Sequence, residues 1–204
     1  MSTQERILNK AIDLFFSRGI KSITMDDIAI ANGISKRTLY EHFTNKADLV
    51  EACISYFISL LDKRMIDIEK ESSNVIDFIL KLSKLNSESL VKCKYTFFLE
   101  LKKFYPAIYE KTITGIRDRN LNTTISLLKR GQKEETILRE INPELVGAII
   151  CNSMDALANQ DFMSNTEFSK QEHFIAFMSL FCRGLTTDKG RLILDEIITE
   201  KNKI

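Results

Sequence analysis

Apolar residues recur at helical spacing along most of the chain, and short polar or glycine-containing stretches separate the periodic segments. In residues 5–18, for example, Ile7, Ala11 and Phe15 fall on one stripe, and Gly19 follows. Residues three and four apart share a helix face, so this pattern predicts an amphipathic helix with a left-handed C-cap at Gly19. The chain as a whole is predicted to be all-α.

Two short helices are predicted directly after the first. Thr24 precedes Asp27 by three positions, which is the spacing of a capping box, and predicts a helix over about residues 25–31. Gly33 allows a tight turn because glycine reaches positive φ without steric cost. Ser35 is placed to cap the third helix.

The third helix has an inner and an outer face. Leu39 and Phe43 stand four residues apart and are expected to be buried. Lys36 lies at the exposed N-terminal end. The outer half then carries four residues, Arg37, Thr38, Tyr40 and Glu41.

Most groups on that outer face can recognise DNA. Lys36 or Arg37 can donate to O6 and N7 of guanine. Thr38 can touch a thymine methyl group, and Tyr40 can reach a phosphate or a base. Glu41 either pairs with Arg37 one turn earlier or accepts from cytosine N4, and we favour the intrahelical pair. Two short helices joined by a glycine turn are typical of a helix-turn-helix that reads the major groove.

Longer helices are predicted beyond residue 46. One rod runs over 46–71, a break follows at 71–74, and another helix begins at Val75. Pro106 should end one helix and begin the next, which runs to about Arg130.

Three further signals complete the pattern. Gly131 is expected to stop the preceding helix. Asn142, Pro143 and Glu144 supply an N-cap, a first-turn proline and an acidic first turn for another helix. Residues 186–200 are predicted to form the last one.

Composition limits the class of protein but does not indicate a function. The 204 residues are 44% hydrophobic and 28% charged, with only seven Gly and two Pro, which is typical of an ordinary globular protein rich in helix. A net charge of +1 means that nucleic-acid binding has to rest on local placement of cations. No run approaches the roughly 18 apolar residues of a membrane span. The four cysteines lack metal-type spacing and the N-terminal residues are polar, so we expect free thiols in the cytoplasm.

The sequence offers little support for an enzymatic function. His42 and His173 are the only histidines, and there is no Gly-rich phosphate loop, nucleophile elbow or HExxH motif. We therefore expect no catalytic residue, no metal site and no cofactor.

Residues 24–49 resemble the DNA-binding head of the TetR family of transcriptional regulators. The shared pattern T-x-x-x-I-A-x-x-x-G-I-S-x-x-T-L-Y-x-H-F-x-x-K-x-x-L is matched by Thr24, Ile28, Ala29, Gly33, Ile34, Ser35, Thr38, Leu39, Tyr40, His42, Phe43, Lys46 and Leu49. The resemblance implies a helix-turn-helix DNA-binding domain over 1–46 and a helical effector-binding and dimerisation domain over 47–204. It also implies DNA contacts from Thr24, Ser35, Lys36, Arg37, Thr38, Tyr40, His42 and Lys46. Among these, Thr24, His42 and Lys46 are expected to clamp phosphates.

The resemblance also implies an effector cavity in the body. Candidate lining residues are Phe57, Leu61, Phe97, Phe98, Leu101, Tyr105, Ile113, Ile116, Asn120, Asn152 and Asp155. Such a cavity suits a largely apolar small molecule with one or two polar groups. The alternative for the aromatic positions is plain core packing.

Two apolar stripes near the end of the chain are candidates for the interface of a homodimer, which the family uses to bring two heads to successive major grooves. They comprise Val146, Ile149, Ile150, Ser153, Leu157, Phe174, Phe177, Met178, Phe181 and Leu185. The expected function is a cytoplasmic, ligand-responsive repressor that binds a double-stranded DNA operator. The alternative is a DNA-binding regulator whose body is a protein-interaction platform without a small-molecule effector.

Overall fold

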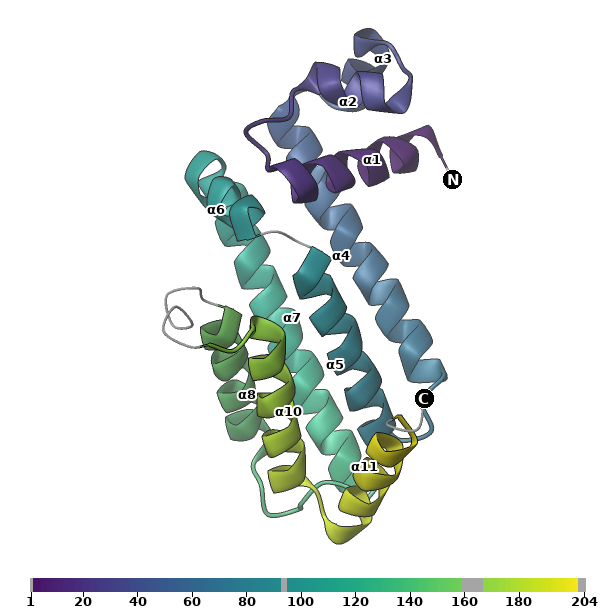
Figure 1. Ribbon diagram of the computed structural model, residues 1–204, viewed down its shortest axis with the longest axis vertical. Helices are drawn as coiled ribbons and strands as arrows, with labels where there is room; N and C mark the ends of the chain where they lie inside the picture. Colours follow the sequence, from purple (N-terminus) through teal and green to yellow (C-terminus); the bar gives the residue numbers. More distant parts are fainter. Residues whose placement is uncertain (1, 93–94, 159–166, 202–204) are drawn as a thin grey trace. The chain divides into compact units, whose positions relative to one another are not determined.

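The computed structural model describes residues 2–92, 95–158 and 167–201, and these ranges form ten helices (Figure 1). They are α1 (Thr3–Arg18), α2 (Met25–Asn32), α3 (Lys36–His42), α4 (Lys46–Lys70), α5 (Val75–Lys92), α6 (Tyr95–Phe104), α7 (Pro106–Lys133), α8 (Pro143–Ala158), α10 (Lys170–Leu185) and α11 (Asp188–Lys201). Extended pairing within them is limited to an isolated bridge between Ile137 and Thr186. The prediction of an all-α fold is confirmed.

The chain divides into two compact units. Unit 1 comprises Met1–Asp67 and Glu88–Thr114, and unit 2 comprises Ile68–Ser87 and Gly115–Ile204. Unit 1 therefore contains α6 and the start of α7 together with the three N-terminal helices. The boundary expected after residue 46, between a DNA-binding domain and an effector-binding domain, stays a prediction.

The beginning of α1 is set by a capping box that the sequence analysis did not use. The Glu5 amide donates to Ser2 Oγ at 3.1 Å, and the Ser2 amide donates to Glu5 Oε2 at 2.7 Å. These bonds satisfy two backbone groups that a helix start leaves free, so α1 begins two residues earlier than predicted. Gly19 ends α1 with φ 84° and ψ 162°, which is a positive φ outside the left-handed helical basin.

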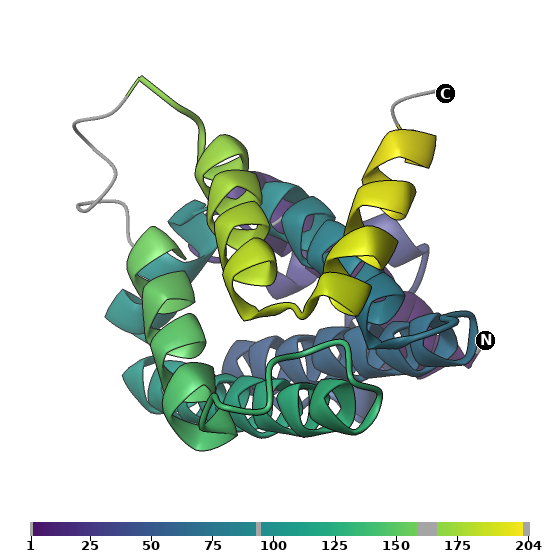
Figure 2. The same ribbon diagram turned by 90° about the horizontal axis from the view of Figure 1, so that it is seen from below.

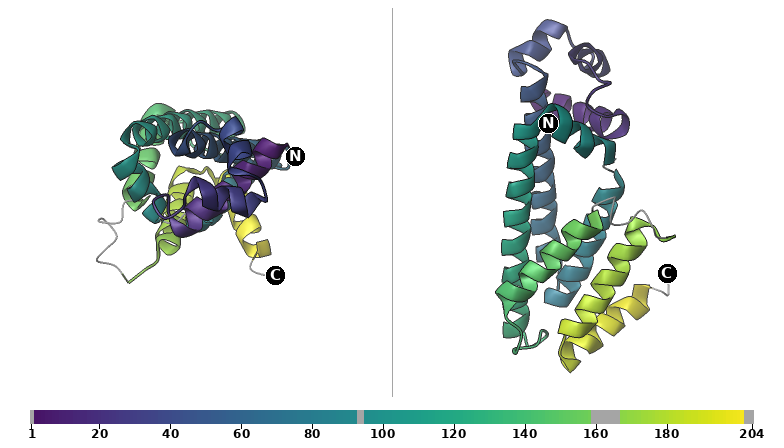
Figure 3. Two further views of the ribbon diagram at one scale, coloured as in Figure 1. Left: turned by 90° about the horizontal axis from the view of Figure 1, so that it is seen from above. Right: turned by 90° about the vertical axis from the view of Figure 1, so that its left-hand side faces the viewer.

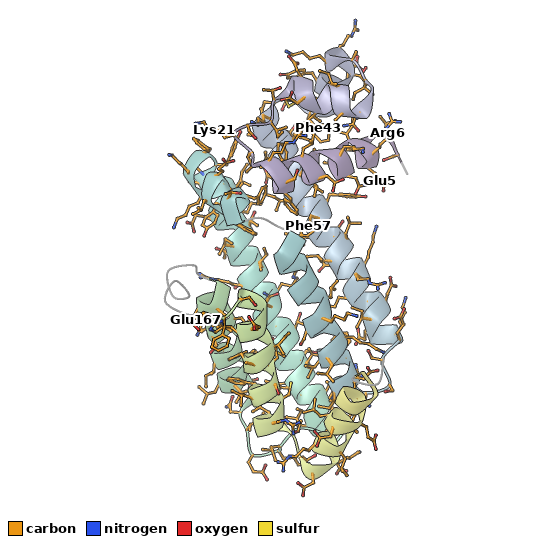
Figure 4. The ribbon with its side chains drawn as sticks, viewed as in Figure 1. Glu5, Arg6, Lys21, Phe43, Phe57 and Glu167 are labelled. Carbon is orange, nitrogen blue, oxygen red and sulfur yellow. The ribbon has the colours of Figure 1, made fainter. Side chains whose placement is uncertain are left out.

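The core of unit 1 holds the three N-terminal helices on the first half of α4. Phe15 of α1, Ile28 of α2, Leu39 of α3 and Leu49 of α4 are all fully buried in one cluster. Figure 1 shows α1, α2 and α3 gathered around the start of α4, and Figure 4 shows Phe43 among their side chains. Burying these apolar side chains fixes which face of each helix remains outside.

Helix α6 is tied to the turn after α1 within the same unit. The Lys21 amide donates to Glu100 Oε2 at 2.8 Å. A side chain at Gly19 would meet that carboxylate, because a Cβ built there lies 2.7 Å from Glu100 Oε2. The turn from α1 to α2 thus favours a glycine for its positive φ, and the flexible Glu100 side chain lies close beside it (Lys21 is labelled in Figure 4).

Unit 2 has a separate core. Val75 and Ile76 of α5, Leu128 of α7 and Leu194 of α11 are buried together with Ile137, which lies in the connection after α7. Helices α8 and α10 lie side by side, and α11 follows α10 after a short turn (Figures 2 and 3). Residues on one face of α8 and α10 contribute to this core, among them Val146 and Met178.

Most predicted helix boundaries in the body are confirmed. α4 ends at Lys70, α7 begins at Pro106, and Asn142 Oδ1 accepts the Leu145 amide at 2.9 Å as the N-cap of α8. The last helix begins at Asp188 because Thr186 and Thr187 pair with the 135–138 segment first.

The stop predicted at Gly131 is wrong, because α7 continues to Lys133 and Gly131 is buried inside it. A Cβ at Gly131 would collide with the side chain of Ile137, which folds back over the helix. Gly131 is therefore present for close packing, and the positive φ occurs instead at Glu135, with φ 59°.

The described cysteines are free thiols. Cys53 and Cys182 are buried, and burial raises the pKa of Cys182 to about 11 and that of Cys53 further still. Both thiols therefore stay protonated and poorly nucleophilic at neutral pH.

Gly190 gives a direct test of the packing in unit 2. A Cβ at this position would collide with the backbone carbonyl of Thr136, which cannot move like a flexible side chain. We expect Gly190→Ala to lower the free energy of unfolding by about 1–3 kcal/mol, measured by urea denaturation. Gly115→Ala is the matched control, because nothing lies within 4 Å of its Cβ and alanine favours a helix by up to about 1 kcal/mol. Equal effects of the two substitutions would contradict the close contact.

Candidate DNA-binding surface

The start of α2 is fixed by Thr24 and Asp27. The Asp27 amide donates to Thr24 Oγ1 at 3.1 Å, while the Thr24 amide and hydroxyl donate to Asp27 Oδ2 at 2.8 and 2.7 Å. The predicted capping box is confirmed. Hydrogen bonds from the Thr24 backbone and then from its side chain lower the pKa of the Asp27 carboxyl.

A left-handed glycine and a serine cap set the turn between α2 and α3. Gly33 has φ 63° and ψ 35°, and its amide donates to the carbonyls of Ala29 and Ile30. Ser35 then caps α3, with its Oγ accepting the Thr38 amide at 3.0 Å. The two hydroxyls of Ser35 and Thr38 lie 2.9 Å apart. The glycine turn and the serine cap predicted from the sequence are therefore confirmed.

The two faces of α3 are as predicted. Leu39 is fully buried, and Phe43, which ends the helix, is buried as well. Tyr40 is 41% exposed, and Thr38 is half-buried. The remaining outward residues are all exposed, namely Lys36, Arg37, Glu41 and His42.

Both cations at the start of α3 are paired with carboxylates. Arg37 Nε lies 3.2 Å from Glu41 Oε1, so the intrahelical pair is confirmed. Lys36 Nζ lies 2.9 Å from Asp26 Oδ1 and 3.1 Å from Asp26 Oδ2. The Asp26 carboxylate raises the pKa of Lys36 through a hydrogen bond and through its charge. Asp26 belongs to α2, so this second pair joins the two helices of the motif.

The three residues expected to clamp phosphates occupy different environments. Thr24 and His42 are exposed. Lys46 is half-buried at the start of α4, and burial lowers the pKa of its ammonium group despite the nearby Glu100 and Asp27 carboxylates. The His42 ring packs at a tilt of 44° to the Phe43 ring.

Several candidate cavity residues form the aromatic core of unit 1. The Phe16 ring meets the Phe57 and Phe97 rings edge to face, at centroid distances of 5.0 and 4.9 Å, and Phe97 meets Phe98 in the same way at 5.5 Å (Phe57 is labelled in Figure 4). Leu101 is fully buried beside them. Edge-to-face ring packing of this kind is the ordinary way to fill a core, so it favours the packing interpretation for these residues.

The other candidates are less enclosed. Leu61, Tyr105 and Ile113 of unit 1 are half-buried, and burial raises the pKa of Tyr105. In unit 2, Ile116 is half-buried, whereas Asn120, Asn152 and Asp155 are exposed. Asp155 Oδ2 pairs with Arg117 Nε at 2.8 Å.

The candidate interface residues divide between two faces. Val146, Ile150, Met178 and Leu185 pack against the core of unit 2, and Ile149 is 45% exposed. The half-buried members are Ser153, Leu157, Phe177 and Phe181, while the side chain of Phe174 lies outside the described residues. Three strongly exposed apolar residues were missed because α8 and α10 carry apolar residues on both sides: Leu145, Ile175 and Leu180.

Within the described ranges, no three His, Cys, Asp or Glu side chains are grouped so that they could hold a metal ion. The helices in these ranges also include none that is both long and apolar enough to cross a membrane.

The fold and the site define a class, an all-helical protein that carries a helix-turn-helix at its N-terminal end. Residues 7–53 match the pattern described as "Bacterial regulatory proteins, tetR family". The N-terminal part of the chain therefore matches this family of transcriptional regulators.

Similarity extends beyond the helix-turn-helix. The chain is 27% identical over 186 residues to the HTH-type transcriptional regulator YvaF of Bacillus subtilis, covering 91% of this chain and 96% of the relative. It is 39% identical over 62 residues to the negative regulator IcaR of the Staphylococcus epidermidis biofilm operon icaADBC, covering 28% and 34%. A solved regulator from Saccharomonospora viridis, in complex with choline, shares the fold with a TM-score of 0.74 at 19% identity, covering 90% and 97%.

Asp26 was not predicted from the sequence as the partner of Lys36 on this surface. Its position in the first turn of α2 reads as a favourable helix-dipole residue, and nothing local shows that it reaches Lys36 ten positions later. Only the packing of α3 on α2 brings the two together.

Acid pH tests the cap of α2. Because the folded-state pKa of Asp27 is lowered, its contribution to stability is present above the ordinary aspartate pKa of about 4 and is lost as pH falls through the folded value. Wild type should therefore melt at a higher temperature than Asp27→Asn at pH 6 to 7, and the difference should shrink toward pH 3. Thermal unfolding followed by circular dichroism measures it. A difference that stays constant over this range would show that the carboxylate charge does not matter.

Proposed function

We propose that this regulator binds an operator through α3, with Lys36, Arg37, Thr38 and Tyr40 facing the base edges and with Thr24, Ser35, His42 and Lys46 near phosphates. The observation that carries the proposal is the polarity of α3. Its apolar side is locked in the core by Leu39, while the opposite side presents cations, a hydroxyl and a phenol. These groups suit the major-groove edges of bases.

Two DNA-binding heads are needed for useful affinity. The net charge of +1 supplies little general attraction to DNA, so one head should bind weakly. A homodimer links two heads and raises their effective concentration at the two half-sites. The operator should then contain half-sites one helical turn, about 34 Å, or a multiple of it apart.

Exposed apolar residues of α8 and α10 support one face for this dimer. Leu145 and Ile149 stand four residues apart on the outward side of α8, with exposed fractions of 62% and 45%. Leu180 of α10 is 73% exposed, and the small exposed residue Ala176 lies one turn earlier on the same side. Neighbouring helices with exposed apolar residues form a patch that a second copy can cover.

We also propose that a small molecule controls the protein in the cytoplasm, where it releases the operator by favouring a body conformation that does not fit both half-sites. Support comes from the similar regulator that was solved in complex with choline. Leu61, Tyr105 and Ile113 keep their place as candidate contacts. The alternative is a body that contacts another protein instead. A compound that releases purified protein from DNA with no other protein present distinguishes the two.

The reading face is tested by titrating the protein on the DNA upstream of its own gene at one fixed salt concentration. A bidentate contact to guanine is worth about 1–3 kcal/mol, so Arg37→Ala should weaken operator binding about tenfold or more. Tyr40→Ala should weaken it severalfold. Arg139→Ala is the matched control, because Arg139 forms an exposed i,i+4 pair with Glu135 in unit 2, like the pair of Arg37 with Glu41. Unchanged operator affinity in both α3 variants would contradict the assignment of α3.

The dimer face is tested with Leu180→Glu. A carboxylate at the centre of an apolar interface loses its water, so this variant should be monomeric at micromolar concentration by light scattering and should bind the operator weakly. Leu192→Glu is the control, since Leu192 is 67% exposed on α11 and lies outside the proposed face. If Leu180→Glu remains dimeric, the face is elsewhere.

A further inference from the structure

The ion pair between α2 and α3 suggests a role beyond stability. Asp26 holds Lys36 Nζ with both carboxylate oxygens, at 2.9 and 3.1 Å. The side chains of Lys36 and Asp26 are 58% and 56% exposed. Exposed pairs of this kind add little to folding stability, typically less than about 1 kcal/mol. Its main consequence should therefore appear in what Lys36 can bind.

We infer that Asp26 is a specificity-determining residue of the DNA-binding surface, which holds Lys36 toward base edges and withholds its charge from phosphates. This inference rests on the proposed function of α3. Asp26 acts through Lys36, so it is a positioning residue rather than a base-reading one.

The geometry explains how one pair can favour an operator over other DNA. An ammonium group has three donors, so Lys36 can keep its contact with Asp26 and still donate to a guanine acceptor. In a non-specific complex this lysine would contact mainly phosphates, and near them the Asp26 carboxylate is itself repelled. The ion pair of Lys36 with Asp26 should therefore lower the affinity of the non-specific complex more than that of the specific one.

The second ion pair on this surface, between Arg37 and Glu41, does not link two helices. Arg37 and Glu41 belong to one helix, and their side chains are 90% and 60% exposed. Such i,i+4 pairs are common on any helix surface and are worth a few tenths of a kcal/mol. Arg37 stays free to rotate toward DNA, whereas Lys36 is held from a different helix.

The test compares operator and random-sequence duplexes of equal length, with wild type and Asp26→Asn over a range of salt concentrations. The substitution keeps the size of the side chain and removes its charge. Non-specific affinity should rise about three- to tenfold, and the slope of log K against log salt should steepen by about 0.9 for each head that gains a phosphate contact. Operator affinity should change less, so the specificity ratio should fall at least about threefold.

Two controls separate this role from a general charge effect. Asp13→Asn removes the same charge from the exposed surface of α1 in unit 1 and should leave the ratio unchanged. In a Lys36→Gln background, Asp26→Asn should have almost no further effect, which is the signature of residues that act as a pair. Circular dichroism and thermal melting confirm that each variant is folded.

The inference is overturned if the ratio is unchanged in Asp26→Asn, if Asp13→Asn lowers it equally, or if the effect persists in the Lys36→Gln background. Failure of the proposed function looks different. Wild type would then show no preference for the upstream duplex, whereas the affinity and salt slope of Asp26→Asn on random DNA would still report on the pair.

Discussion

Burial of Leu39 in the core of unit 1 is the contact on which the proposed DNA-binding surface depends. Helix α3 has seven residues, and isolated helices of that length are not stable in water. Its shape therefore comes from the Ser35 cap at one end and from the burial of Leu39, worth about 1.5–3 kcal/mol for a fully buried leucine. Because Leu39 can only face inward, Arg37, Tyr40 and Glu41 are held outward.

The same core extends to residues far along the chain. Phe97 and Leu101 of α6 are buried in it, and Glu100 binds the backbone of the turn that precedes α2. The three N-terminal helices therefore share their core with α6. A later segment of the chain thus helps to position them.

Charge on the surface is balanced locally rather than globally. Lys36 and Arg37 each face a carboxylate, so the start of α3 carries cations without a strong net field. Under the proposed function, this balance and the overall charge of +1 imply weak attraction to arbitrary DNA. Operator affinity would then come from matched contacts and from pairing two heads.

Features with local causes could be predicted from the sequence. The Thr24 and Ser35 caps, the Gly33 turn, the inward Leu39 and the Arg37–Glu41 pair all depend on residues within one or two turns of each other. Features set by packing could not be predicted in this way.

Three places in the chain show where the local signals fail. Gly131 looked like a helix stop because nothing nearby in sequence reveals that Ile137 packs on it. Asp26 looked like a helix-start residue only. On α8, Val146 and Ile149 both belong to apolar stripes, and only the structure shows that Val146 faces the core and Ile149 is exposed.

Interference by methylation of guanine N7 shows whether α3 enters the major groove, because N7 lies in that groove and is an acceptor for lysine and arginine. We expect N7 methylation to block binding of the wild-type protein within two patches of the upstream DNA, about one helical turn or a multiple of it apart. Arg37→Ala should lose interference at one guanine in each patch. Binding that is insensitive to N7 methylation, or a single patch, would contradict a dimer that reads the major groove through α3.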